Sequence, residues 1–203
     1  MWYPARQLAI LLALAASPAT AQPTAEIGSW RLTCATDRMT DRASCTMRHR
    51  DWVEPPAGTA PGLALEVVDR GGRLVPVVTS RELTLEGASR GLLALTGTAQ
   101  LRFPPNRMIE LPCGLDGRSL ICAPRGEDAA RAEQELLAAD KALVRMAGLS
   151  GDGGEPTELR LAGTREAVAR FAREAPPAPA PDPAPGVDAP ELLQRLLRRF
   201  GWQ

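Results

Sequence analysis

Four cysteines, placed as two pairs that each bracket a short polar turn, constrain the fold of this chain more than any other feature. Cys34 and Cys45 enclose "ATDRMTDRAS", and Cys113 and Cys122 enclose "GLDGRSLI". Four cysteines allow three pairings. Because each pair is local to one hairpin-like unit, we predict the disulfides Cys34–Cys45 and Cys113–Cys122. Closing loops of this size stabilises a folded chain by roughly 2.5–3 kcal/mol each in the chain-entropy model.

The N-terminus predicts export, and export affects how the cysteines are interpreted. A short head carries Arg6, an apolar run follows from Leu8 to Ala16, and Ala19-Thr20-Ala21 is a small-x-small cleavage pattern. We predict a signal peptide over residues 1–21, cleaved near Ala21, and a mature protein in the periplasm or secreted. The apolar run is well below the roughly 20 residues of a membrane span, so a retained anchor is the weaker interpretation. In an oxidising compartment four cysteines favour disulfides over metal binding or catalysis.

The charge balance argues against a nucleic-acid partner. The chain has 24 basic and 24 acidic residues, and loss of Arg6 with the signal peptide leaves 23 basic residues against 24 acidic ones. Nucleic-acid-binding proteins usually present a basic surface. We therefore expect a partner of another class.

Two alternative roles for the cysteines have less support. Zinc ligands are usually spaced about two to four residues apart, and the only histidine, His49, lies four residues after Cys45. A dithiol oxidoreductase normally carries a C-x-x-C motif, which the sequence lacks. We predict a structural role for the cysteines and no metal site.

Reactive chemistry has little support elsewhere in the chain. The sequence has no G-x-S-x-G elbow, P-loop, H-E-x-x-H motif or Gly-rich dinucleotide turn. We interpret His49 as a polar strand residue, and Lys141, the only lysine, as part of a solvated helix end. The sequence therefore predicts no catalytic residue and no cofactor.

Two further sets of residues have both a functional and a structural interpretation. Asp37 and Asp41 offer carboxylate oxygens for a cation, but their spacing is unlike a calcium loop, which favours a solvated turn with local ion pairs. Trp30 and Trp52 would suit a ligand-stacking surface, but each adjoins a predicted strand, which favours a place in or at the edge of the core.

Residues 22–174 predict one domain of the α+β class, a small β-rich unit of antiparallel, sandwich-like sheets with one or two helices towards its C-terminal part. Gly-, Pro- and Asp-rich breaks separate the strand candidates. The predicted strands cover residues 29–34, 44–50, 63–69, 74–80, 92–103, 108–113, 119–123, 142–147 and 157–163.

Two helices are predicted in the last third of this domain. The Ala/Glu/Leu-rich stretch from Glu127 to Asp140 places Ala132, Leu136 and Ala139 at helical spacing, although periodicity also permits one long helix to Met146. The second helix covers residues 163–175. It is predicted to have Thr164 as its N-cap and to dock one face on the sheet through Ala167, Val168, Phe171 and Ala172.

The C-terminal residues predict a tethered helix. Residues 175–186 are rich in Pro and Ala and favour a semi-rigid extended linker. Residues 187–203 predict an amphipathic helix, which would pack on its own domain, bind a groove on a partner protein or adsorb to an anionic membrane surface. The candidate partner-binding residues are Leu192, Leu193, Leu196, Leu197, Phe200, Trp202, Arg195, Arg198 and Arg199.

The order of these features resembles the invasion-associated locus B family of exported bacterial proteins. The resemblance covers about residues 27–171 and depends on "SWRLTC", "LPCGLDGRSLIC" and "LRLAGTREAVARF" taken together. It implies a small β-rich domain with disulfides, an exported location and an association with host-cell contact, without a catalytic centre. The linker and the Arg/Leu-rich tail depart from that pattern and put the host-cell role in doubt.

The sequence therefore favours an exported, disulfide-stabilised, non-enzymatic protein of the bacterial periplasm or outer surface that binds a protein or envelope partner. The alternative is a periplasmic envelope enzyme or a thiol-linked redox protein. Neither the partner nor the oligomeric state follows from the residues.

Overall fold

The computed structural model describes residues 24–41, 43–58, 61–81, 97–147 and 154–175. The predicted signal peptide, almost the entire linker and the tethered helix lie outside the described residues. The described strands, in chain order, are β1 (Thr24–Ile27), β2 (Trp30–Thr36), β3 (Ala43–Glu54), β4 (Leu63–Asp69), β5 (Leu74–Ser80), β6 (Thr98–Arg102), β7 (Ile109–Asp116), β8 (Ser119–Cys122), β9 (Lys141–Ala147) and β10 (Thr157–Arg160). The described helices are α2 (Glu127–Ala138) and α3 (Thr164–Glu174).

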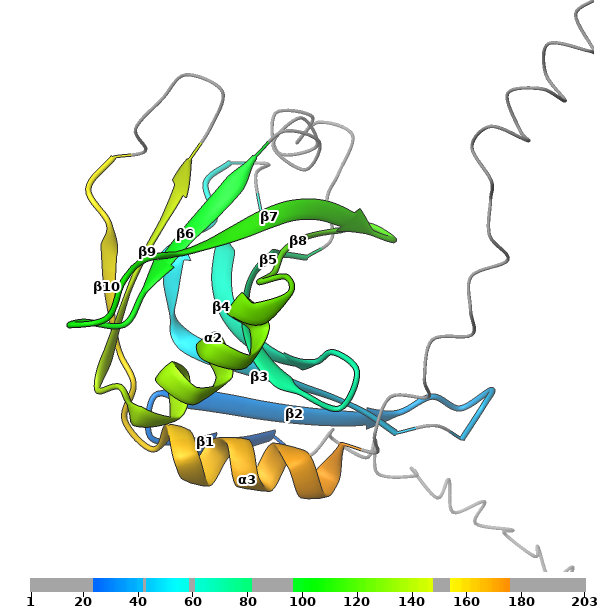
Figure 1. Ribbon diagram of the computed structural model, residues 1–203. Helices are drawn as coiled ribbons and strands as arrows, with labels where there is room; N and C mark the ends of the chain where they lie inside the picture. Colours follow the sequence, from blue (N-terminus) through cyan, green and yellow to red (C-terminus); the bar gives the residue numbers. More distant parts are fainter. Residues whose placement is uncertain (1–23, 42, 59–60, 82–96, 148–153, 176–203) are drawn as a thin grey trace, which may run out of the picture.

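These strands form a single ten-stranded antiparallel sheet with the order β1-β2-β3-β4-β5-β8-β7-β6-β9-β10. The sheet curls so that β6, β9 and β10 lie across from β3 and β4 (Figure 1). Side chains from both halves enter one core, among them Trp30, Leu65 and Leu101. This arrangement confirms the predicted β-rich α+β class.

The central strands are apolar on both faces, as expected of strands covered on both sides. In β4, Leu63, Leu65 and Val67 face the main core, while Val68 packs against a smaller cluster with Val75, Val77, Ile121 and Ala123. Pro76 lies inside β5 at a point where the ladder with β8, which begins at Val78, does not reach. A proline is tolerated there because no ladder hydrogen bond from its nitrogen is needed.

The two helices cover different parts of the sheet. Ala132 and Leu136 of α2 are fully buried, and the helix packs against β5. It ends at Ala138 because Ala139 adopts extended backbone, so the alternative of one long helix to Met146 is wrong. Helix α3 buries Ala167 and Phe171 and packs against β1, β2 and β3 (Figure 1).

Several local predictions need correction. The strand expected from Leu92 to Phe103 is shorter within the described residues, where β6 excludes Gly97 and Phe103; the Phe103 carbonyl instead accepts a turn hydrogen bond from the Asn106 amide at 2.8 Å. Lys141 is not at a helix end but begins β9, where it is paired with Arg160. Ala172 is exposed because the buried stripe of α3 follows Ala167 and Phe171.

Thr164 is not the N-cap of α3. That position belongs to Gly163, whose φ of 73° lies in the left-handed region that glycine tolerates best. Thr164 is the first helical residue, and its buried hydroxyl donates to the Leu161 carbonyl at 2.8 Å and accepts from the Trp30 indole N–H at 2.9 Å. The hydroxyl therefore joins the start of α3 to β2.

Candidate recognition surface on the first hairpin

Both predicted disulfides are present, and each joins residues that lie directly opposite on neighbouring strands. Cys34 pairs with Cys45 across β2 and β3, with Cα atoms 4.1 Å apart. Cys113 pairs with Cys122 across β7 and β8, with Cα atoms 3.9 Å apart. All four cysteines of the chain are thus bonded and none is a free thiol. Such disulfides are typical of an oxidising, non-cytoplasmic compartment.

The first disulfide lies where the β2–β3 hairpin extends past the rest of the sheet. In the described ladders, β3 pairs with β4 from Met47 onward, whereas Ala43 to Thr46 pair only with β2. The hairpin therefore continues as a two-stranded ribbon that projects from the domain (Figure 1). An isolated two-stranded hairpin is marginally stable in water. The disulfide supplies the order that a third strand would otherwise give.

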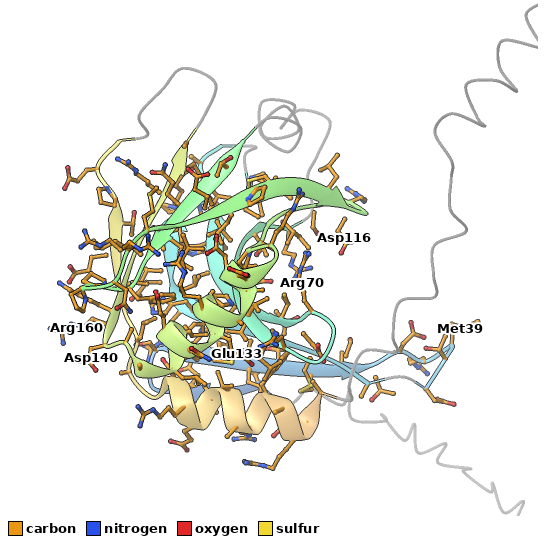
Figure 2. All side chains as sticks on the ribbon, viewed as in Figure 1. Met39, Arg70, Asp116, Glu133, Asp140 and Arg160 are labelled. Carbon is orange, nitrogen blue, oxygen red and sulfur yellow. A yellow bond between two sulfur atoms is a disulfide. The ribbon has the colours of Figure 1, made fainter. Side chains whose placement is uncertain are left out.

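The tip of this ribbon is held by its own side chains. The Asp37 carboxylate accepts hydrogen bonds from the backbone amides of Met39 and Thr40, at 2.7 and 2.9 Å. These bonds lower the pKa of Asp37 below its ordinary value because they stabilise the charged form. This is a backbone cap, rather than the ion pairing that the sequence predicted for Asp37. The cap leaves Met39 at the end of the ribbon with 93% of its surface exposed (Figure 2).

The outward face at the base of the ribbon carries a row of charged residues. Register aligns Glu26 of β1 with Arg31 of β2, Arg31 with Arg48 of β3, and Arg48 with Glu66 of β4. Arg31 donates to Glu26 at 3.0 Å. The pKa of Glu26 is lowered by this hydrogen bond and by the nearby charge of Arg50. Glu66 is almost entirely buried and accepts both Nε and Nη2 hydrogen bonds from Arg81.

Arg48 is held by Trp52 rather than by a carboxylate. Its guanidinium carbon lies 4.1 Å from the centre of the Trp52 ring, which is well within cation–π range. The ring in turn lies close to Gly62, where a Cβ would come within 2.6 Å of the indole. The pKa of Arg48 is lowered mainly by its partial burial; Glu66 opposes this shift and Arg31 adds to it.

The two tryptophans therefore do not form one ligand-stacking surface. Trp30 is fully buried in the core, as the structural interpretation predicted. Trp52 is half-buried on the opposite face, paired with Ala64 after a register shift in β3. Only Trp52 contributes to the outward surface.

His49 lies in a strand, as predicted, but it is completely buried. Its Nε2 donates to the Arg160 carbonyl at 2.7 Å, and its Nδ1 accepts from the Asp51 amide at 3.0 Å. The ring also meets Trp30 edge-on, with ring centres 5.4 Å apart. His49 therefore joins β3 to β10 and has a structural place.

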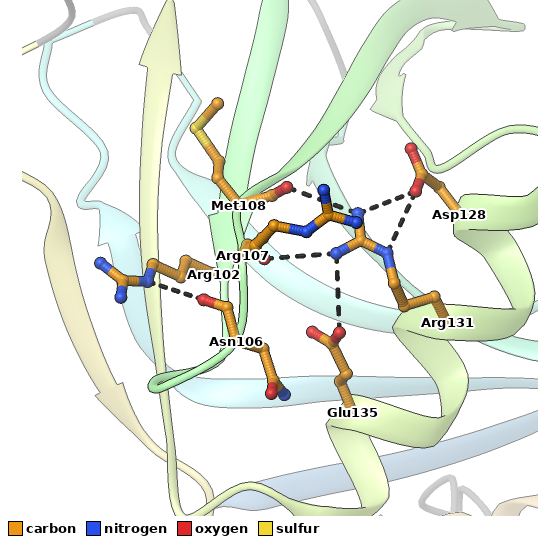
Figure 3. Close-up of polar contacts among 7 residues, drawn as sticks. All are labelled: Arg102, Asn106, Arg107, Met108, Asp128, Arg131 and Glu135. Carbon is orange, nitrogen blue, oxygen red and sulfur yellow. Dashed lines mark hydrogen bonds and ion pairs between the residues drawn. The ribbon is translucent and has the colours of Figure 1, made fainter.

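The second stapled hairpin is braced by α2. Arg131 donates to Asp128 at 2.8 Å, pairs with Glu135 at 3.6 Å, and reaches the carbonyls of Arg107 and Met108, each at 3.4 Å (Figure 3). These bonds fix the start of β7. Leu115, near the tip of this hairpin, is 54% exposed.

The remaining hollows in the described part of the chain have mixed character. Two adjoining grooves of about 440 and 390 Å³ share Asp140 and Leu161, and Lys141 is paired with Glu158 at 2.8 Å in one of them. Among the described residues no three His, Cys, Asp or Glu side chains gather closely enough to hold a metal ion. No helix of the described segments has the length and apolar character of a membrane span.

The candidate partner-binding residues of the tail, between Leu192 and Trp202, lie outside the described residues, so their role stays a prediction. Sequence reasoning missed the charged row, because it depends on β1, which was not predicted, and on the exact register of four strands. The only available signal was the arginine at alternating positions in "RHR", Arg48 and Arg50.

No family model matches the sequence, and no curated protein matches it. Among solved structures, the chain is similar to the crystal structure of invasion associated protein B from Bartonella henselae, with 14% identity and a TM-score of 0.44 over 74% of this chain and 95% of that chain. At these values the likeness does not place the chain in a family, and the family resemblance stays a prediction.

Proposed function

We propose that this chain is an exported, disulfide-stabilised binding protein of the bacterial periplasm or outer surface, which contacts a protein or envelope partner through the stapled ribbon from Thr36 to Ala43. The observation that carries the proposal is the almost complete exposure of Met39 at the end of a ribbon that the Cys34–Cys45 disulfide and the Asp37 cap keep ordered. Methionine adapts to irregular apolar surfaces, which suits a contact residue.

Pre-organisation supports the same proposal. The Cys34–Cys45 disulfide and the Asp37 cap restrict the ribbon before any partner arrives. Binding by a restricted loop costs less conformational entropy than binding by a free one. The ribbon can therefore bind with a small contact area.

A site-specific photo-cross-linker tests this function. We would place the cross-linking residue at position 39 of the full-length exported chain, and at position 118, in the turn of the other stapled hairpin, as the matched control. We expect a discrete cross-linked species from position 39 alone, with a lower yield when Cys34 and Cys45 are both changed to Ser. Identical products from both positions, or none from position 39, would contradict the proposal.

The role of the C-terminal residues 187–203 is tested by deleting them. If residues 187–203 serve a partner or a membrane, their deletion changes what is captured from the envelope and leaves the melting temperature of the domain nearly unchanged. A large loss of melting temperature would show that they pack on the domain. Host-cell surfaces, which the family resemblance implies, form one partner class to be tested.

The alternative of a thiol-linked enzyme makes a different prediction. It requires a cysteine that mild reductant releases as a reactive thiolate. Alkylation followed by mass spectrometry measures this directly. Two disulfides that resist mild reduction would exclude the thiol-linked mechanism, whereas one alkylated cysteine under those conditions would favour it over the binding proposal.

A further inference from the structure

The charged row at the base of the ribbon contains a pair of arginines that the fold brings into direct opposition. Arg31 and Arg48 are register partners on β2 and β3. Residues directly opposite in an antiparallel pair have Cβ atoms about 4.5–5.5 Å apart, and like charges in that position are destabilising. An anion between the two guanidinium groups would remove this repulsion.

The guanidinium of Arg48 is oriented by the Trp52 ring, and its N–H groups have no hydrogen-bond acceptor among the described residues. Stacking on Trp52, at 4.1 Å, holds the guanidinium plane in place. Glu66 of β4 is also a register partner of Arg48, but its carboxylate accepts hydrogen bonds from Arg81. Among the described residues the guanidinium of Arg48 makes this ring contact and no hydrogen bond, so its N–H donors are available to a ligand.

The local charge balance selects the kind of anion. In the charged row, Glu26 is the one carboxylate shared by Arg31, at 3.0 Å, and Arg50, at 4.0 Å, whereas Arg48 forms no ion pair among the described residues. The neighbouring Arg81–Glu66 pair is neutral. Three arginines against the single carboxylate of Glu26 leave this row with two more positive than negative charges, which matches a phosphate monoester with a charge of about −1.5 to −2 at neutral pH.

We propose that Arg31 and Arg48 form a binding site for a phosphate monoester group, with Arg48 as the bidentate donor and Trp52 as the residue that positions it. Planar guanidinium groups donate paired N–H bonds to phosphate oxygens, which a lysine ammonium does not reproduce. The site lies at the base of the ribbon and is independent of the proposed contact through Met39.

Isothermal titration calorimetry of the purified mature chain tests the site. The soluble probes are inorganic phosphate and glycerol 3-phosphate, with glutarate as the carboxylate comparison. Vesicles of phosphatidylcholine with and without phosphatidic acid test whether the phosphate is presented by a lipid. Binding to the soluble probes indicates a free phosphate or phosphate ester, and binding to phosphatidic acid vesicles alone indicates a lipid headgroup; either result supports the site if the variants below weaken it.

The variants separate this site from general charge. We expect Arg48→Gln and Arg31→Gln each to weaken phosphate binding about tenfold or more, since each removes hydrogen bonds between charged groups. Arg48→Lys keeps the charge and should still weaken binding several-fold. Arg118→Gln removes a charge from the distant second hairpin and should leave binding unchanged, and thermal unfolding checks that each variant is folded.

Three results would overturn the assignment. They are no binding to any phosphate probe, binding that Arg48→Gln and Arg31→Gln leave unchanged, and binding of glutarate as tight as that of phosphate. None of these depends on a partner at the ribbon tip, so failure of this site and failure of the proposed function are distinguishable.

Discussion

At the scale of single residues, buried polar side chains join parts of the chain that are far apart in sequence. The Trp30 indole donates to Thr164, and the His49 ring donates to the carbonyl of Arg160. Buried polar groups are stable only when paired, so each of these contacts specifies its partner. The sequence indicated that Trp30 is a core residue, but it gave no sign of either partner, because both lie more than 100 residues away.

Asp37 provides a pH prediction at this scale. Its folded pKa lies below the ordinary value of 3.8, so the contribution of the cap to ribbon order is complete above that value and is lost as pH falls through the lower, folded pKa. NMR should show the Met39 and Thr40 amide signals shifting together over that acidic range. In the Asp37→Asn variant the acidic transition should disappear; its persistence would assign the transition to another group.

At the scale of elements, the sequence predicted what local pattern encodes. Alternating and continuous apolar runs located β4, β5, β8 and β9, and spacing within two hairpins identified both disulfides. Strands that are recognised only by their pairing with a neighbouring strand were harder to predict from the sequence. β1 is four residues long and has a single buried apolar residue, Ile27, so its pattern is too short to distinguish it from a loop.

The two disulfides should contribute similarly to overall stability, but only Cys34–Cys45 should order the projecting ribbon. Changing both Cys34 and Cys45 to Ser should lower the free energy of unfolding by about 2.5–3 kcal/mol, the value expected for a closed loop of this length. It should also speed hydrogen exchange in residues 35–44, whose described strand residues pair only with each other across β2 and β3. Urea unfolding and exchange mass spectrometry measure the two effects. The double change of Cys113 and Cys122 is the matched control, with a similar loss of stability and unchanged exchange in the ribbon. Unchanged exchange in the Cys34 and Cys45 variant would show that the ribbon is ordered without its staple.

At the scale of the whole molecule, the edge strand β10 and the residues after it meet β3 and the β1–β2 turn through individual contacts rather than a continuous ladder. Thr157 of β10 donates its hydroxyl to the Val53 carbonyl at 2.8 Å, and the Ser29 amide donates to Ala162 at 2.9 Å. Gly28 permits this approach, since a Cβ at that position would lie 2.1 Å from the Ala162 carbonyl oxygen. Periodicity within single segments cannot predict such a closure, because it depends on the summed twist and curl of all the strands.

His49 should be a main support of this closure. His49→Ala leaves the Arg160 carbonyl without its donor and opens a cavity beside Trp30, so we expect a loss of about 2–4 kcal/mol in the free energy of unfolding. Urea denaturation measures this loss. Thr46→Ala, an exposed change on the same strand, should stay within about 0.5 kcal/mol of the parent protein. A His49→Ala variant as stable as this control would show that the closure does not depend on the ring.

The contact between Trp30 and Thr164 also affects when the domain can complete its fold as the chain is synthesised. The two residues are separated by 134 positions, so the first strands cannot complete their core until the segment that becomes α3 has emerged. Cys34 and Cys45, only 11 positions apart, can meet long before that. In an oxidising environment the first covalent cross-link can therefore form while the core is still incomplete, before the segment of α3 is available.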